Sequence, residues 1–444
     1  MRILQVVHDF LPNATGGTEI YTYSLSKALS KHHDVHLFFK DMEIDKSFKK
    51  GNFDGLPFVA VNPRKCSKSN SYFNLIKSKI YFSENNKKID EIFKDMIKEF
   101  KPEIIHFQHL ICLSMNLVDI AYKAKIPIVF TAHDYWLLCP KAHFIDDNNV
   151  LCTDRKNKYK CVKCLSNVKL YRFEKVKIFQ SNTYIELAKN LIKIALNPFK
   201  KICTIYYIFY LRPKMIQDII KKVNIFVAPS KILKSKFVEN GLPTKKVVYV
   251  DSGIDNSNLK NIQKTKSKQI RFAFIGSVSI HKGIKILIES FDTIKDAVLE
   301  IYGFTSEESK KKYMNLAKNK NVHFMGSFKH DEIGKIFSKI DILIMPSICM
   351  ENSPLTIREA FASKTPVIAS DIGGLSEMIQ DSETGLLFKA GDSRDLFKKI
   401  RYFINNPVEV KKMSKGIKKV KTIEENLNEM EIIYKDLILK NSSK

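Results

Sequence analysis

Two glutamates flank a predicted helix start in the segment IMPSICMENSPLTIREAF. Glu351 precedes the letters SPLT and Glu359 follows them, two helical turns further on. A proline near a helix start, here Pro354, leaves neighbouring backbone N–H groups free to point at an anion. The carboxylates can hold ribose or sugar hydroxyls, or they can form a solvated helix face. The surrounding strand–turn–helix–strand pattern favours the hydroxyl-binding interpretation.

Three further positions have residue types suited to binding an anionic ligand. Lys282 and Gly283 stand at a helix start, where a lysine is unfavourable unless an anion lies nearby. Gly16 and Gly17 precede a predicted helix from about Thr18 to Lys31 and allow close approach of a phosphate, although an ordinary tight turn explains them equally simply. His133 follows a predicted strand, where it can bind a polar ligand or serve as a structural cap.

Four cysteines gather in one short stretch: Cys139, Cys152, Cys161 and Cys164. The last pair forms the motif CVKC, the usual nucleus of a zinc site, and four thiolates complete a tetrahedral structural site. The first pair is spaced more loosely than in standard zinc motifs. Structural zinc, packed reduced thiols and redox chemistry are the three interpretations of this cluster.

The chain is strongly basic, with 74 lysines and arginines against 47 acidic residues in 444 positions and a net charge of +27. Such a balance suggests a polyanionic partner or membrane surface. Only nine of these residues are arginine, the side chain that reads bases and phosphates bidentately. Nucleic-acid binding is therefore the weaker hypothesis, and part of the excess charge is consistent with a solvated surface.

Short β-rich runs alternate with helix-length amphipathic stretches, and the series occurs twice, which predicts two doubly wound parallel α/β domains. The first domain is predicted at 1–229, the second at 230–422, and a last helix at 423–444 packs back toward the first. Ligands of such sheets bind beyond the carboxyl ends of the strands, here in the cleft between domains. The predicted strands are Ile3–Val7, Val35–Phe39, Ile104–Gln108, Ile128–Ala132, Ile225–Ala228, Val247–Val250, Arg271–Ile275, Val298–Tyr302, Val322–Met325, Ile342–Met345 and Val367–Ala369.

The amino-terminal letters MRILQVVHDF predict a strand rather than an export leader, and the longest apolar run, Ile202–Leu211, is too short to span a bilayer. We therefore expect a cytoplasmic protein that is not integral to the membrane. Reduced thiols fit that compartment.

Taken together, the residues resemble the retaining nucleotide-sugar glycosyltransferases of family 4, of the bacterial surface-glycan type, whose GT-B fold has two facing Rossmann-like domains. The resemblance covers most of the chain. It lies in GGTE, HDYWLLCP, HKG, IYGF, HFMGSF, DILIMPS, ENSPLTIRE, TPVIASDIGGLSEMI and ETGLLF, in that order.

The resemblance implies a catalytic set of His133, Lys282 and Glu351, and no cofactor for catalysis. His133 contacts the transferred sugar, Lys282 neutralises the leaving diphosphate, and Glu351 holds sugar hydroxyls. Glu359 binds the nucleoside ribose. The remaining donor-binding residues are Gly16, Gly17, Gly276, Asn352, Ser353, Pro354 and Leu355.

One position departs from the family pattern. Ser277 follows Gly276 where the family often has an arginine, and Arg358 is expected to point away from the cleft. Half of the cationic clamp on the diphosphate is missing, so a non-catalytic binder of sugar nucleotides or glycans is the alternative to a transferase.

A basic aromatic insert, at about 160–222, contains ICTIYYIFYL bracketed by lysines and arginine, and the segment Tyr72–Phe82 has the same character. Cations beside apolar residues suit an anionic membrane interface, although a core-packing helix with a solvated edge has the same pattern. We expect a protein at the inner face of the cytoplasmic membrane that moves a sugar from a nucleoside diphosphate to a hydroxyl of a lipid-linked or polysaccharide acceptor.

Overall fold

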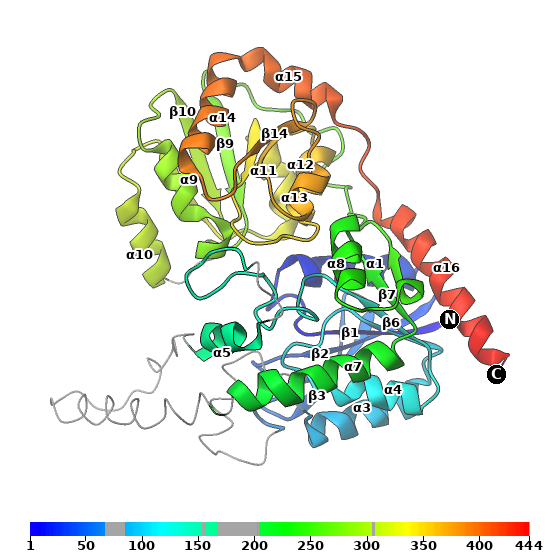
Figure 1. The fold of residues 1–444 in the computed structure, drawn as a ribbon. Helices are drawn as coiled ribbons and strands as arrows, with labels where there is room; N and C mark the ends of the chain where they lie inside the picture. Colours follow the sequence, from blue (N-terminus) through cyan, green and yellow to red (C-terminus); the bar gives the residue numbers. More distant parts are fainter. Residues whose placement is uncertain (67–84, 153–156, 167–201, 203, 304–306, 444) are drawn as a thin grey trace.

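The computed structural model describes the chain except residues 67–84, 153–156, 167–201, 203, 304–306 and 444, and it has two lobes, each built on a parallel sheet (Figure 1). The segment Tyr72–Phe82 and most of the basic aromatic insert lie outside the described residues. Within the described part of the chain, no helix combines the length and apolar character needed to cross a bilayer.

The first sheet has eight strands in the order β3-β4-β2-β1-β5-β6-β7-β8, all parallel except the β3–β4 hairpin. Helices lie on both faces, so the central strands are buried on both sides and consist almost entirely of apolar residues. The strands are β1 (Arg2–Val7), β2 (Asp34–Lys40), β3 (Phe48–Phe53), β4 (Leu56–Val61), β5 (Ile104–Phe107), β6 (Ile128–Thr131), β7 (Ile225–Ala228) and β8 (Val247–Tyr249). The helices are α1 (Gly17–Ser30), α3 (Lys87–Phe100), α4 (Asn116–Lys123), α5 (Lys158–Ser166), α7 (Arg212–Lys222) and α8 (Lys231–Glu239).

The second sheet has six strands in the order β11-β10-β9-β12-β13-β14, all parallel. Two apolar layers again enclose it. The strands are β9 (Ile270–Ile275), β10 (Ala297–Tyr302), β11 (Val322–Gly326), β12 (Ile342–Met345), β13 (Val367–Ser370) and β14 (Gly385–Phe388). The helices are α9 (Ile284–Phe291), α10 (Glu307–Leu316), α11 (Ile333–Ser338), α12 (Leu355–Ala362), α13 (Gly374–Met378), α14 (Ser393–Asn405) and α15 (Pro407–Gly416).

The predicted domain boundary at 229/230 is wrong. The run Val247–Val250 was assigned to the second domain, but it forms β8, the edge strand of the first sheet, and pairs with β7. The reason is local: α8 is a short crossover that packs against both strands, so a parallel strand following it returns to the same sheet.

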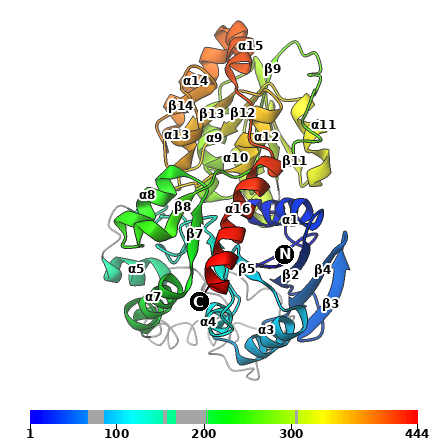
Figure 2. The same cartoon turned by 90° about the vertical axis from the view of Figure 1, so that its right-hand side faces the viewer.

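The last helix, α16 (Ile423–Ser442), leaves the second lobe and lies along the first, beside α1 (Figure 2). Thr422 and Glu425 form a capping box at its start. Met430 and Tyr434 are buried in the apolar layer that covers the first sheet. The Tyr21 hydroxyl donates to Asn426 Oδ1 at 2.8 Å, which fixes α16 on α1.

Candidate functional site

A cavity of about 500 Å³ lies between the two lobes, at the carboxyl ends of both sheets. It is lined by all eleven residues proposed from the sequence for catalysis or donor binding: Gly16, Gly17, His133, Gly276, Lys282, Glu351, Asn352, Ser353, Pro354, Leu355 and Glu359. They come from five separate segments of the chain. The four clustered cysteines do not line it.

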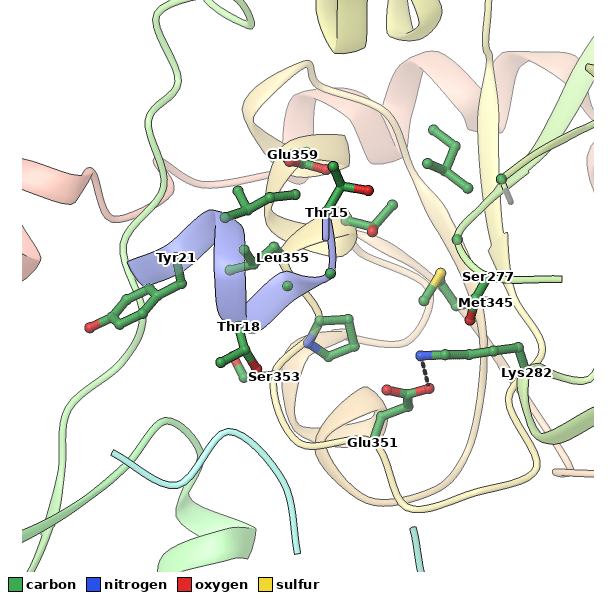
Figure 3. Close-up of a pocket in the computed structure, with 18 of the residues that line it drawn as sticks. Thr15, Thr18, Tyr21, Ser277, Lys282, Met345, Glu351, Ser353, Leu355 and Glu359 are labelled. Carbon is green, nitrogen blue, oxygen red and sulfur yellow. Dashed lines mark hydrogen bonds and ion pairs between the residues drawn. The ribbon is translucent and has the colours of Figure 1, made fainter. Parts of the chain in front are cut away.

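Two helices begin at the cavity. α1 starts after Gly16 and α12 after Pro354, and neither cap residue bonds the helix through its side chain. The first N–H groups of both helices are therefore not capped by these two residues, although the Glu19 N–H of α1 bonds its own carboxylate. Both dipoles present their positive ends to the same space. The starts also lie close together, since a Cβ built on Gly17 would contact Leu355 at 3.9 Å. Figure 3 shows α1 entering the cavity beside Leu355 and Ser353. This arrangement suits an anion such as a diphosphate.

Lys282 and Glu351 form an ion pair in the wall of the cavity, with Nζ 2.6 Å from Oε1 (Figure 3). Ser347 Oγ also donates to Oε1 at 2.8 Å. Burial opposes both charges, but their mutual attraction outweighs it, so the pKa of Lys282 is raised and that of Glu351 is lowered to about 2. Both side chains are charged at neutral pH.

Gly283 is required where it stands. Its φ is +74°, and a Cβ there would lie 1.8 Å from the Pro346 carbonyl oxygen. The backbone after Lys282 therefore packs directly on the end of β12, which brings the lysine to Glu351.

His133 follows β6 and lines the cavity near α1. Its Nε2 donates to Gln108 Oε1 at 2.7 Å, and its ring contacts the ring of Tyr21 edge-on at 5.2 Å. Burial lowers the pKa of His133 to about 3, so the imidazole is neutral. With its single proton on Nε2, Nδ1 is a hydrogen-bond acceptor.

Glu359 accepts a hydrogen bond from His330 Nε2 at 2.7 Å. Burial lowers the pKa of His330, but the hydrogen bond and charge of Glu359 outweigh it, so the net shift is upward. His330 also lines the cavity. Nothing in the sequence distinguished it, because it begins a short 3-10 helix after β11 (His330–Glu332) and reaches Glu359 only in three dimensions.

Asn352 lines the cavity, but its side chain is occupied elsewhere. Asn352 Nδ2 donates to the carbonyl oxygens of Ala132 and His133, and its Oδ1 accepts from Ser230 Oγ at 2.6 Å. Its side chain therefore joins the two lobes and is not free to bind a ligand. A ligand can contact only the other residues of the loop before α12.

Arg358 points away from the cavity, as predicted. Its guanidinium binds both carboxylate oxygens of Asp251 and donates to Ser353 Oγ at 2.7 Å. It is not among the residues lining the cavity and is no substitute for a cation at Ser277, which does line it.

His143 also lines the cavity and was not proposed from the sequence. Its ring stacks on that of His281, with centroids 4.8 Å apart and planes 12° from parallel. Met350 N donates to the His143 carbonyl oxygen at 3.3 Å. The segment that contains the clustered cysteines thus contacts the second lobe beside Lys282.

Two family models match the chain. The model described as Glycosyltransferase Family 4 matches residues 15–258, and the model described as Glycosyl transferases group 1 matches residues 255–420. Together they cover both lobes and every segment that lines the cavity.

Two curated relatives illustrate the similarity. An uncharacterized glycosyltransferase of Methanocaldococcus jannaschii is 30% identical over 184 residues, which are 40% of this chain and 49% of that protein. The N,N'-diacetylbacillosaminyl-diphospho-undecaprenol alpha-1,3-N-acetylgalactosaminyltransferase of Campylobacter jejuni is 27% identical over 184 residues, 41% of this chain and 48% of that protein. The chain spans about half the length of these relatives.

Among solved structures, HepE of Anabaena in complex with UDP and glucose aligns with a TM-score of 0.64 at 14% identity, over 98% of this chain and 100% of that one. The likeness is one of fold and extends over both lobes.

Proposed function

Because this chain belongs to glycosyltransferase family 4 and has the GT-B fold, we propose that it transfers a sugar from a nucleoside diphosphate to a hydroxyl group of a lipid-linked or polysaccharide acceptor, with retention at the anomeric carbon. One observation carries the proposal. The Lys282–Glu351 pair and the starts of α1 and α12 share one interlobe cavity.

In the proposed reaction the bond between the anomeric carbon and the diphosphate oxygen breaks, and the acceptor oxygen bonds to that carbon. The acceptor proton passes to an oxygen of the leaving diphosphate on the same face of the sugar. Negative charge grows on the diphosphate as the bond breaks. The Lys282 ammonium and the free N–H groups of α1 and α12 stabilise that charge because they are fixed in advance.

Glu351 binds the sugar in this scheme. Its hydrogen bonds from Lys282, Ser347 and Cys349 all end on Oε1. No hydrogen bond from the described residues ends on Glu351 Oε2, so this oxygen can accept one from a sugar hydroxyl. Glu359 has the corresponding position for the nucleoside ribose, with His330 holding one of its oxygens. The neutral His133 supplies an acceptor to the sugar and adds no charge.

A non-catalytic binder of the same fold is the alternative, and Ser277 is its only support. The Lys282–Glu351 pair argues against it. A binder gains little from a buried cation held where charge develops during bond cleavage, whereas a transferase needs one.

We also propose that the protein acts at the inner, cytoplasmic face of the membrane and touches its anionic surface. Support comes from the described end of the basic aromatic insert. There Ile202, Tyr206 and Tyr210 have exposed fractions of 63%, 60% and 67%, and Lys214 is also exposed. Sedimentation with anionic vesicles and not with neutral ones tests this part.

The main test is a donor screen. The purified chain is incubated with UDP-, GDP- and ADP-sugars, and thermal stabilisation and slow donor hydrolysis are read in parallel. Lys282→Ala and Glu351→Ala are expected to abolish hydrolysis. Lys285→Ala and Glu289→Ala are the matched controls, since these residues form an exposed Lys–Glu pair on α9 outside the cavity. Stabilisation without hydrolysis by any donor would favour the binder.

A further inference from the structure

The clustered cysteines lie on three separate pieces of local structure. Cys139 is held in a turn by its N–H bond to Tyr135 O at 2.7 Å. Cys152 closes a small hairpin, where its N–H bonds Phe144 O at 2.7 Å. Cys161 and Cys164 are three residues apart on α5 and so share one face of that helix.

These three pieces converge. Cys164 Sγ lies 3.8 Å from the carbonyl oxygen of Ile145 in the hairpin. The turn that holds Cys139 runs directly into the hairpin, since the Ala142 N–H bonds Cys139 O at 2.9 Å and the Tyr135 N–H bonds Ala142 O at 3.3 Å. An apolar side chain of similar size could fill the space at each of these four positions. Packing alone therefore does not require four cysteines to come together from a turn, a hairpin and a helix.

We propose that Cys139, Cys152, Cys161 and Cys164 bind one Zn²⁺ ion as a structural tetrathiolate site. Binding releases four thiol protons and forms four zinc–sulfur bonds, without oxidation or reduction. With four protein ligands the tetrahedral site is closed, so the ion has no open position for substrate and takes no part in sugar transfer.

The proposed site requires its four thiols to move together when zinc binds. Among the described residues, only His8, Asp9 and Glu19 offer three ligand atoms within 4.8 Å of one another. No three of the four cysteine sulfurs lie that close to one another, so the thiols must approach one another to share one zinc ion. The His8 set is the poorer site for an ion, because Lys40 Nζ already lies 2.8 Å from Asp9 Oδ2 and supplies the positive charge.

Zinc at this position supports the wall of the cavity. The hairpin follows directly after His143, which stacks on His281 of the second lobe next to Lys282. Fixing the hairpin to α5 also fixes the contacts of this segment with the second lobe beside the ion pair, which include the His143–His281 stack and the bond from Met350 N–H to His143 O. The metal therefore favours the arrangement of lobes that forms the cavity.

Metal content of the full-length chain, purified without a metal-affinity tag, tests the proposal. We expect about one zinc per chain, as for other structural sites of this type. Each of Cys139→Ser, Cys152→Ser, Cys161→Ser and Cys164→Ser is expected to lose most of it. Cys66→Ser and Cys112→Ser are matched controls and are expected to keep it, since they lie outside the cluster.

Metal reconstitution of the wild-type chain keeps the proposal testable if the cysteine variants fail to fold. The wild-type chain, stripped of metal under reducing conditions, is titrated with Co²⁺, and the absorption of a tetrahedral cobalt–thiolate centre is expected, followed by its loss on adding Zn²⁺. A reduced chain that binds neither ion, iron in place of zinc, or a disulfide within the cluster in freshly purified protein would overturn the proposal. None of these readings depends on transferase activity.

Discussion

The Lys282 ammonium and the Glu351 carboxylate are 2.6 Å apart, although 69 residues separate them in the chain. Lys282 follows β9 and Glu351 follows β12, which are neighbours in the second sheet. Parallel strands end at one edge of a sheet, so the loops after them meet. Only 23% of the lysine side chain and 13% of the glutamate side chain are exposed. The pair is therefore both part of the structure and part of the cavity.

Removing one partner of this pair leaves the other as an uncompensated buried charge. We expect Lys282→Met or Glu351→Gln alone to lower the free energy of unfolding by about 3 kcal/mol. The double variant, which leaves no charge, is expected to be more stable than either. Urea unfolding of the three variants measures this. Lys285→Met and Glu289→Gln, in the exposed pair on α9, are expected to cost less than about 1 kcal/mol. Equal losses in both pairs would contradict the assignment.

Gln108 is expected to be a positioning residue for His133. It is fully buried, and its Oε1 accepts from His133 Nε2 at 2.7 Å. Gln108→Met keeps the volume but leaves the imidazole N–H unpaired, which costs about 1–3 kcal/mol. We expect sugar transfer to slow by about 5- to 100-fold, with most of the loss in kcat. Gln108→Glu keeps an acceptor and is expected to raise the pKa of His133, which shifts the acid limb of the rate profile upward. An unchanged profile in Gln108→Glu would show a merely structural role.

Acid is expected to destabilise the fold through its histidines. Burial is the largest cause of a lowered pKa in His8, His36, His106, His133, His143 and His281, reaching about 3 in His106 and His133. Unfolded histidine titrates near pH 6.5, so below that pH the unfolded chain binds more protons and the free energy of unfolding falls. His330 has the opposite sign: its raised pKa adds stability that is fully present below pH 6.5 and is lost as the pH rises through its folded value.

Melting temperatures measured between pH 7.5 and 5 check this expectation. The wild-type chain should melt at progressively lower temperature as the pH falls through 6.5. His133→Asn has no proton to gain at that position and is expected to show a shallower slope. His323→Asn is the control, since this histidine is exposed on β11. A slope that His133→Asn leaves unchanged would contradict the assignment of His133 as a buried neutral group.

The sequence was sufficient for the fold class because strands buried on both faces are continuous apolar runs, such as Ile342–Met345, which the structure reproduces without change. It was insufficient for the β3–β4 hairpin, because β3 is largely polar and exposed, although β4 is an apolar and mostly buried run. Asp54-Gly55 at its turn, both with positive φ, was the signal that could have found it. The sequence predicted the site residues that lie next to strand ends, but it did not predict His143 and His330. Their positions depend on contacts between distant loops, which no local pattern records.

Arg358 is expected to act on donor binding from outside the cavity. It holds the Asp251 carboxylate bidentately and the Ser353 hydroxyl in the loop before α12. Lysine has no planar fork, so Arg358→Lys loses at least one charge-assisted bond, worth about 2 kcal/mol. We expect a lower free energy of unfolding and a higher KM for the donor, with kcat little changed. Asp251→Asn should reproduce the stability loss, and an effect confined to kcat would contradict the role.

Substitution of Ser277 distinguishes a catalytically weakened donor site from an inactive one. It is exposed, lines the cavity and follows Gly276 at the end of β9, so a longer side chain has room to reach the anion site from the same edge as Lys282. Ser277→Arg adds a charge-assisted donor, worth about 1.5–3 kcal/mol before screening by solvent reduces it. We expect nucleoside diphosphate to bind about tenfold more tightly at low salt, a gain that shrinks as salt is added. Ser277→Gln, of similar reach but uncharged, should bind as the wild type does. Tighter binding accompanied by faster transfer indicates that the serine weakens an active clamp, while equal effects of arginine and glutamine would contradict a diphosphate at this edge of the sheet.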